Sequence, residues 1–178
     1  SPDKSMTFGT LGTMSTGYGS PVPVIFGRGS VGSPTMAPGF ALQAVKVAVD
    51  ENTGVVEILD ACCVQDVGFA INPLAVESQI QGGMVQSLSL GFSEEIVWDN
   101  NGVLRNPTLL DYRLPTALDV PNIEVAIVEV PVEGAGPFGA KGMGEPPIAP
   151  GAAALANAVF DAVGARVDTI PVTAERIM

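Results

Sequence analysis

The chain has 178 residues, of which 47% are apolar and 15% are charged, and its formal net charge is −11. This length fits one domain, or one domain with a short arm. The negative charge argues against nucleic-acid binding, because a phosphate backbone requires clustered Lys and Arg. No apolar run reaches the roughly 18 residues of a membrane-spanning helix. The first ten residues have neither the basic nor the apolar segment of a signal peptide. Because the chain does not begin with Met, we expect a piece of a longer protein.

The chain contains no His, and its only cysteines are Cys62 and Cys63. Without His, neither Ser-His-Asp nor Cys-His catalysis can lie within this chain. Two thiols are also too few for an iron–sulfur cluster. Adjacent cysteines in a strand point to opposite faces and rarely bridge each other. We therefore expect two free thiols in a reducing, cytoplasmic environment.

Residues 1–38 are rich in Gly, Ser, Thr and Pro and show no helical period. We expect an extended arm or a set of loops that packs on a partner chain, or, for the first ten residues, a disordered tail. From residue 39 a domain begins that extends to residue 178. Apolar alternation on both sides of the turn at residues 50–54 predicts a β-hairpin over residues 40–66.

The second half of the chain alternates helical and extended patterns. Asn72 and Pro73 open a helix expected to reach about residue 90. Residues 92–98 and 123–130 are expected to be strands, and residues 133–147 a loop. A last helix is expected from residue 150 to Gly164. The result is an α+β fold with the order β-β-α-β-β-α, a ferredoxin-like sheet with helices on one face, preceded by the Gly/Pro-rich arm.

The loop before the last helix carries Lys141 and Glu145 among several glycines. Glycines allow the backbone to approach a ligand closely, and the following helix directs free N–H groups at the loop. Pro146 and Pro147 restrict the backbone beside Glu145, which suits a carboxylate that acts as a general base. The alternative is structural: Glu145 caps the helix and Lys141 is solvated.

Four segments, in this order, resemble those of the molybdenum hydroxylases of the xanthine dehydrogenase and aldehyde oxidase type. Asp66–Pro73 is similar to a D-x-G-x-x-[IL]-N-P segment, and Gln79–Gly83 to a Q-[IV]-x-G-[GA] segment. Asn106–Pro115 resembles an N-x-x-x-Y-x-[IL]-P region, and Lys141–Pro147 resembles K-x-x-G-E-P-P. The chain is thereby similar to the C-terminal part of the molybdopterin-binding large subunit.

The resemblance implies a molybdopterin cofactor, either as such or as its cytosine dinucleotide. The pterin holds the molybdenum, so the protein supplies no metal ligand. It implies that Glu145 takes a proton from a molybdenum-bound hydroxyl, so that oxygen from water reaches an aldehyde or N-heterocycle carbon. The cofactor-binding residues it implies are Gln79, Gly82, Gly83, Lys141, Gly142 and Gly144. For Gln79 the alternative is an exposed helix residue.

The family's large subunit is longer than this chain, so the resemblance implies activity only within a multi-subunit complex. The expected partners are the N-terminal part of the molybdenum subunit, an iron–sulfur subunit with 2Fe–2S clusters, and an FAD subunit. Two alternatives remain: a non-catalytic assembly subunit of such a complex, and an independent α+β binding domain. The substrate itself is not disclosed by the sequence.

Overall fold

The computed structural model describes residues 5–20, 22–30, 32 and 35–178. They divide into two compact units, Ser1–Gly32 and Ser33–Met178. The predicted boundary at residues 38 and 39 and the packing of the arm on a partner chain stay predictions. The alternative of a disordered tail falls partly on residues 1–4, which lie outside the described residues.

The first unit contains a helix that the prediction of extended structure missed. This helix, α1, spans Phe8–Thr16. It begins at Thr7, whose hydroxyl accepts a hydrogen bond from the backbone N–H of Thr10 at 3.1 Å. Such a cap satisfies an N–H group that would otherwise lack a partner. The helix ends at Gly17. Local capping in a glycine-containing segment was enough to form a helix without an apolar period.

The second unit is built on a three-stranded sheet in the order β1-β2-β3, with β1 at Ala41–Val49, β2 at Val56–Asp66 and β3 at Asn122–Val128. The predicted hairpin is confirmed, since β1 and β2 pair antiparallel across the turn. Strand β3 pairs in parallel with β2, so the connection between them must cross over the sheet. Burial alternates along β1 and β3, which leaves one sheet face exposed.

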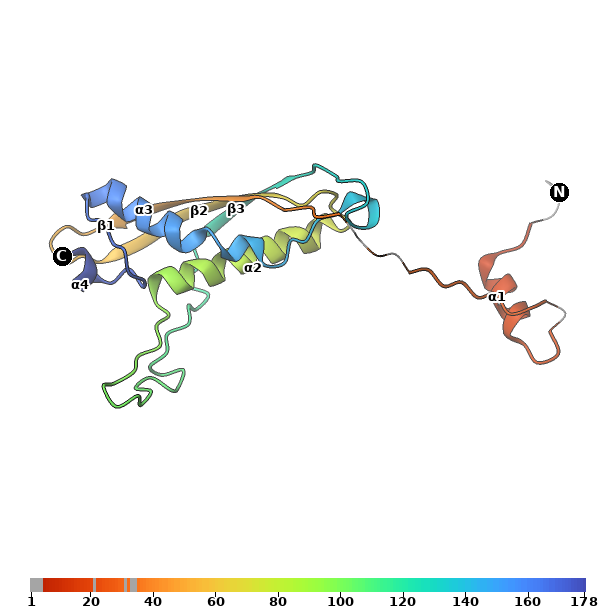
Figure 1. Ribbon diagram of the computed structural model, residues 1–178, viewed down its shortest axis with the longest axis horizontal. Helices are drawn as coiled ribbons and strands as arrows, with labels where there is room; N and C mark the ends of the chain where they lie inside the picture. Colours follow the sequence, from red (N-terminus) through yellow and green to blue (C-terminus); the bar gives the residue numbers. More distant parts are fainter. Residues whose placement is uncertain (1–4, 21, 31, 33–34) are drawn as a thin grey trace. The chain divides into compact units, whose positions relative to one another are not determined.

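Two long helices cover the other face of the sheet (Figure 1). Helix α2 spans Pro73–Phe92 and starts as predicted, with the Asn72 side chain accepting a hydrogen bond from Ala75 N at 3.2 Å. Helix α3 spans Gly151–Val163 and ends at Gly164, whose φ of 73° is left-handed. The two helices meet the sheet in a core whose fully buried members are Cys63, Ile80, Met84, Leu155 and Val159.

The strand predicted at residues 92–98 is wrong. Helix α2 continues to Phe92, and beyond it only an isolated bridge joins Trp98 to Leu104 across the turn at residues 99–102. Residues 93–121 continue from the end of α2 as a long segment that projects away from the sheet and the helices (Figure 1). The sheet therefore has three strands among the described residues, and the four-stranded ferredoxin-like topology is not formed. The α+β class and the helices on one face are confirmed.

After α3 the C-terminal residues return to the end of helix α2. A one-turn helix, α4 at Ala174–Ile177, follows a stretch in which Val172 N donates to Gly91 O at 2.7 Å. Cys62 and Cys63 are both free, as expected. Among the described residues, no helix combines the length and the apolar character that crossing a bilayer requires.

Candidate functional site

The loop that carries Lys141 and Glu145 runs from β3 to α3 through two short 3-10 turns, η1 at Pro137–Gly139 and η2 at Pro146–Ile148. Its first bend needs glycine. Gly139 has a φ of 80°, and a methyl group there would lie 2.8 Å from Pro131 Cβ. A side chain at this position would thus meet both backbone strain and a steric clash. The bend turns the chain back toward the end of β2.

Lys141 forms an ion pair with Asp66, the last residue of β2. The two side chains are only 5% and 12% exposed. Burial by itself raises the pKa of the Asp66 carboxyl, but the hydrogen bonds from Lys141 and from the backbone N–H of Gly68 outweigh it and hold the pKa below its usual value. The structural alternative of a solvated Lys141 is therefore wrong.

The end of β2 and the loop touch through their backbones as well. Lys141 N donates to Val67 O at 2.9 Å. Gly68 has a φ of 70°, and a methyl group on it would lie 2.3 Å from Gly139 O. Only glycine allows this close approach. Asp66, Val67 and Gly68 thus form a fitted support for Lys141.

Three glutamine side chains donate hydrogen bonds to carbonyl groups farther along the same loop. Gln65 Nε2 lies 3.2 Å from Met143 O, and Gln79 Nε2 lies 3.2 Å from Gly144 O. Gln43 Nε2 lies 2.6 Å from Pro147 O. Residues 141–147 are therefore held from β1, β2 and α2 at once.

Glu145 differs from its neighbours in having no such contact. Its side chain is exposed and makes no capping hydrogen bond at the start of η2. It does not cap α3 either, because the N-cap residue of α3 is Pro150 and the first turn of α3 contains no acidic residue. Only its backbone is fixed, with Ile148 N donating to Glu145 O at 2.9 Å. The Glu145 backbone is therefore held in place, while its carboxylate remains available to bind a ligand.

The predicted glycines of α2 have different surroundings. A methyl group on Gly83 would lie 3.0 Å from Pro147 Cβ and Cγ, so this glycine lets η2 pack tightly against the helix. A methyl group on Gly82 or on Gly142 would meet no protein atom within 4 Å. The contact with Pro147 thus accounts for a glycine at position 83, whereas Gly82 and Gly142 border open space.

A pocket of about 340 Å³ lies between the first turns of α2 and the loop. It brings together two predicted cofactor-binding residues that are far apart in sequence, Gln79 and Lys141, with Gly144 beside them. Phe69 at its margin is 5.7 Å, centroid to centroid, from the ring of Phe138. Neither Gly82 nor Glu145 lines it, and within the described ranges no group of three or more His, Cys, Asp or Glu side chains is placed to hold a metal.

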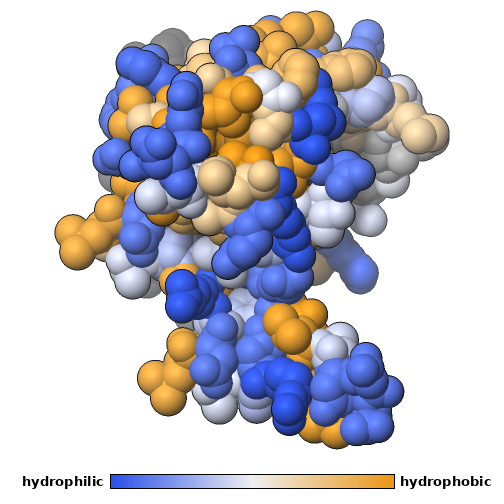
Figure 2. All heavy atoms as spheres, turned by 90° about the vertical axis from the view of Figure 1, so that its left-hand side faces the viewer, coloured by the Kyte–Doolittle hydropathy of each residue, from blue (hydrophilic) through white to orange (hydrophobic). Residues whose placement is uncertain are grey.

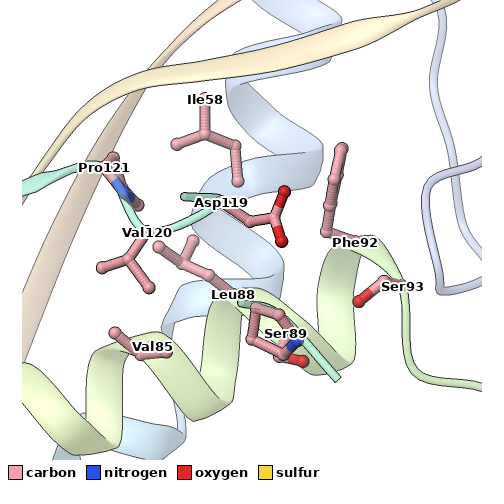
Figure 3. Close-up of a pocket in the computed structure, with 10 residues that line it drawn as sticks. Ile58, Val85, Leu88, Ser89, Phe92, Ser93, Asp119, Val120 and Pro121 are labelled. Atoms are coloured by element: carbon pink, nitrogen blue, oxygen red, sulfur yellow. The ribbon is translucent and has the colours of Figure 1, made fainter. Parts of the chain in front are cut away.

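A second, smaller pocket lies at the other end of α2, where Ile58 of β2 and Leu88 of α2 approach Val120 of the projecting segment (Figure 3). It contains none of the predicted site residues. Its lining carboxylate, Asp119, accepts hydrogen bonds from the N–H and the hydroxyl of Thr116, and these bonds lower its pKa. This carboxylate closes a local turn, so we assign no chemistry to the pocket.

Sequence reasoning placed Asp66 in a segment that resembles the family but gave it no role at the site, and it missed Gln43 and Gln65. A signal for the glutamines was present, since period-two alternation places Gln43 on the same strand face as Val45, Val47 and Val49. A polar residue on an inward-facing strand position must find a hydrogen-bond partner. Nothing in the pattern identified the loop carbonyls as those partners.

Comparison with known proteins matches residues 11–121 to the model of a molybdopterin cofactor-binding domain. The matched residues include Gln79 and Gly82 but end before Lys141. The chain is 41% identical over 149 residues to a xanthine dehydrogenase molybdenum-binding subunit of Escherichia coli O157:H7, covering 83% of this chain and 20% of that protein.

Solved structures agree with this match. Quinoline 2-oxidoreductase from Pseudomonas putida 86 superimposes with a TM-score of 0.70 and 40% identity, covering 74% of this chain and 17% of that one. For a reconstituted CO dehydrogenase from Oligotropha carboxidovorans, the TM-score is 0.75 and the identity 30%, with 81% and 18% covered. The chain spans about a fifth of the length of these relatives. On the family match and these likenesses, the predicted resemblance is confirmed, and the chain belongs to the molybdopterin cofactor-binding domain family.

Proposed function

We propose that this chain is part of the molybdopterin-binding subunit of a molybdenum hydroxylase that oxidises an aldehyde or N-heterocycle with water as the source of oxygen. Glu145 is the general base. The observation that carries the proposal is the contrast within the loop. Residues on both sides of Glu145 are fastened by glutamine side chains of the sheet, while its carboxylate has no protein partner among the described residues.

The residues around the loop fit such a cofactor. The backbone N–H groups of Gly142, Met143 and Gly144 donate to no acceptor among the described residues, and Gly142 borders open space. Successive free N–H groups suit an anionic or carbonyl-bearing ligand. The Lys141 charge is already neutralised by Asp66. The loop therefore offers neutral donors, and its lysine serves to hold it in place.

When bound, the molybdenum cofactor supplies the two-electron oxidation of the substrate carbon. The contribution of this chain is to move a proton. A Glu145 Oε atom accepts the proton of the attacking hydroxyl group and thereby raises the nucleophilicity of its oxygen. Because Pro146 and Pro147 restrict the backbone, the carboxylate starts from a narrow range of positions, which lowers the entropy cost of the reactive geometry.

Gln79 is proposed to contact the cofactor directly. Its Nε2 is engaged by Gly144 O, while its Oε1 makes no hydrogen bond among the described residues. An amide with one group fixed and the other free presents an oriented acceptor. This arrangement fits the N–H groups of a pterin ring. Gly82 and Gly83, one turn farther along α2, keep bulky side chains away from the same side of the helix.

The chain covers a fraction of the proteins it resembles, so we propose that it works inside a larger complex. Several large apolar side chains of the projecting segment at residues 93–121 are exposed, and Figure 2 shows apolar side chains scattered among polar ones on this lower part of the molecule. The exposed side chains include Trp98, Leu110 and Leu118, which are 60%, 90% and 96% exposed. Such surfaces are typical of contacts with further protein. The proposed partners are the N-terminal part of the subunit, a 2Fe–2S subunit and an FAD subunit, in the cytoplasm, with the cofactor as a cytosine dinucleotide.

The test is Glu145→Gln in the complete, assembled enzyme. The variant keeps the shape of the side chain but removes its basicity, so turnover should fall by about 10³-fold or more while molybdenum content stays unchanged. Glu133→Gln is the matched control, because Glu133 is also an exposed glutamate of the β3–α3 connection. Near-normal turnover of the Glu145 variant would contradict the proposal and favour a non-catalytic assembly role.

A further inference from the structure

Two glutamines lie on the inner face of the sheet, directly below the loop that carries Glu145. Gln43 of β1 pairs with Cys63, and Ala41 pairs with Gln65 of β2, so the two glutamines are diagonal neighbours on one face. Of their inward-facing neighbours on these strands, Cys63 belongs to the hydrophobic core and Val45 packs against it. Two amide groups in such surroundings are costly unless they are hydrogen-bonded.

Both amides use their N–H groups to hold the loop, at positions that bracket Glu145. Gln65 donates to Met143 O, two residues before Glu145, and Gln43 donates to Pro147 O, two residues after it. The donors stand on paired strands, which are more rigid than a loop. Two fixed points on either side restrict rotation of the segment between them and hence the direction of the Glu145 side chain.

The other half of each amide is unsatisfied. Gln43 Oε1 and Gln65 Oε1 are buried without a hydrogen-bond partner in the part of the chain that the structure describes. Gln65 is 0% exposed. These unpaired oxygens cost free energy that an apolar side chain of similar size would not, which offsets part of what the two donated hydrogen bonds contribute. What an apolar residue cannot do is donate to the loop carbonyls.

We propose that Gln65 and Gln43 are positioning residues that set the direction of the Glu145 carboxylate by holding the carbonyl groups of Met143 and Pro147. The inference rests on the proposed role of Glu145 and deepens it. Lys141 and Asp66 fasten the start of the loop, and the two glutamines fasten the part that bears the base. The position of the Glu145 carboxylate is thus set by the sheet, through the hydrogen bonds of the Gln43 and Gln65 amides.

The first test measures the loop without the cofactor. Trypsin can cut after Lys141 only when the loop opens, because this side chain is buried. In the cofactor-free form of the complete enzyme, Gln65→Met should raise the rate of cleavage between Lys141 and Gly142 by about tenfold, because opening then breaks fewer bonds. Cleavage after Arg105, in the projecting segment, should not change. Gln86→Met is the matched control, since Gln86 is an exposed glutamine of α2.

The second test measures catalysis in the loaded enzyme. A base displaced by about 1 Å can lose about 10²-fold in rate, so Gln65→Met should lower kcat by about 10- to 100-fold with little change in KM. Combined with Glu145→Gln, it should cause almost no further loss, because the glutamine acts through the glutamate. Gln43→Met, at a less buried position, should show the same pattern and guards against a folding defect in the Gln65 variant.

The outcomes separate the two proposals. Unchanged cleavage after Lys141 together with unchanged kcat would overturn the positioning role. An equal loss of kcat in the presence and absence of the Glu145 carboxylate would also overturn it, because the glutamine would then act on something else. If Glu145→Gln alone kept near-normal turnover, the proposed function would fail, while the cleavage experiment would still decide whether the amides hold the loop.

Discussion

The loop at residues 139–148 and the projecting segment at residues 93–121 are both irregular, but they are held in opposite ways. The loop is fastened by side chains and backbone groups from β1, β2 and α2, one of them through a buried ion pair. The projecting segment is held mostly by its own turns, such as the hydrogen bond from Gly102 N to Asp99 O at 3.0 Å. Its apolar side chains are left exposed (Figure 2).

The difference matches the proposed roles of the two regions. The proposed base would have to return to the same place at each turnover, which a loop tied to the rigid core allows. A segment proposed to meet another part of a complex would gain its order from that contact and need less support of its own.

The largest difference in stability between the two regions is expected when one glycine of each is replaced by alanine. Gly68 and Gly102 both have positive φ, but a methyl group on Gly68 would lie 2.3 Å from Gly139 O whereas one on Gly102 meets nothing within 4 Å. Gly68→Ala should therefore lower the free energy of unfolding by about 3 kcal/mol or more, and Gly102→Ala by about 1 kcal/mol. Denaturation of the complete subunit measures both. Equal losses would mean that the loop is not tightly fitted to the end of β2.

A smaller effect on the free energy of unfolding is expected from the ion pairs Lys141–Asp66 in the loop and Arg105–Asp99 in the projecting segment. Asp66→Asn leaves Lys141 buried without a partner and should cost about 2 kcal/mol at neutral pH. Because the folded-state pKa of Asp66 is lowered, the stability it contributes is present above its unfolded pKa of about 3.9 and is lost as the pH falls through the folded value. The difference in stability between the wild type and this variant should therefore shrink below about pH 4.

The control is Asp99→Asn in the projecting segment. Asp99 lies 3.8 Å from Arg105, whose side chain is 64% exposed, so loss of this pair should cost less than about 0.5 kcal/mol at any pH. Asn keeps the side-chain oxygen that caps the turn. A pH-independent deficit in Asp66→Asn would show that its charge is not what fastens the loop.

The smallest expected effect concerns the base of the projecting segment. Tyr112 donates a hydrogen bond to Glu94 Oε2 at 2.5 Å, and this bond raises the pKa of the tyrosine. Tyr112→Phe should cost about 1 kcal/mol or less and should speed tryptic cleavage after Arg113 severalfold. Cleavage after Lys141 should stay the same, because the Tyr112–Glu94 hydrogen bond does not involve the loop at residues 139–148. A parallel increase at Lys141 would show instead that they open together.

Sequence reasoning succeeded where the determinants are local. The hairpin, the start of α2 at Asn72 and Pro73, and the end of α3 at Gly164 each depend on residues next to one another in the chain. It failed at residues 92–98, where strand-forming residues are present but lie on a segment that leaves the sheet. It also missed α1, whose single cap at Thr7 replaces an apolar period. At residues 92–98, composition does not report which neighbours the chain will find, whereas for α1 a single capping residue is too weak a signal in a glycine-containing segment.

By itself, the sequence determined the family, the α+β class and the identity of the glutamate proposed as the base, because these depend on residue types at fixed spacing. Only the tertiary structure decided that Lys141 is paired with Asp66, that Gly83 accommodates Pro147 while Gly82 stays open, and that Gln43 and Gln65 lie below the loop. Those partners are separated by more than sixty residues along the chain (about 64 between Gly83 and Pro147, and more for the others). Contacts at that range arise from the pairing of strands and the packing of α2 on η2, which no local pattern encodes.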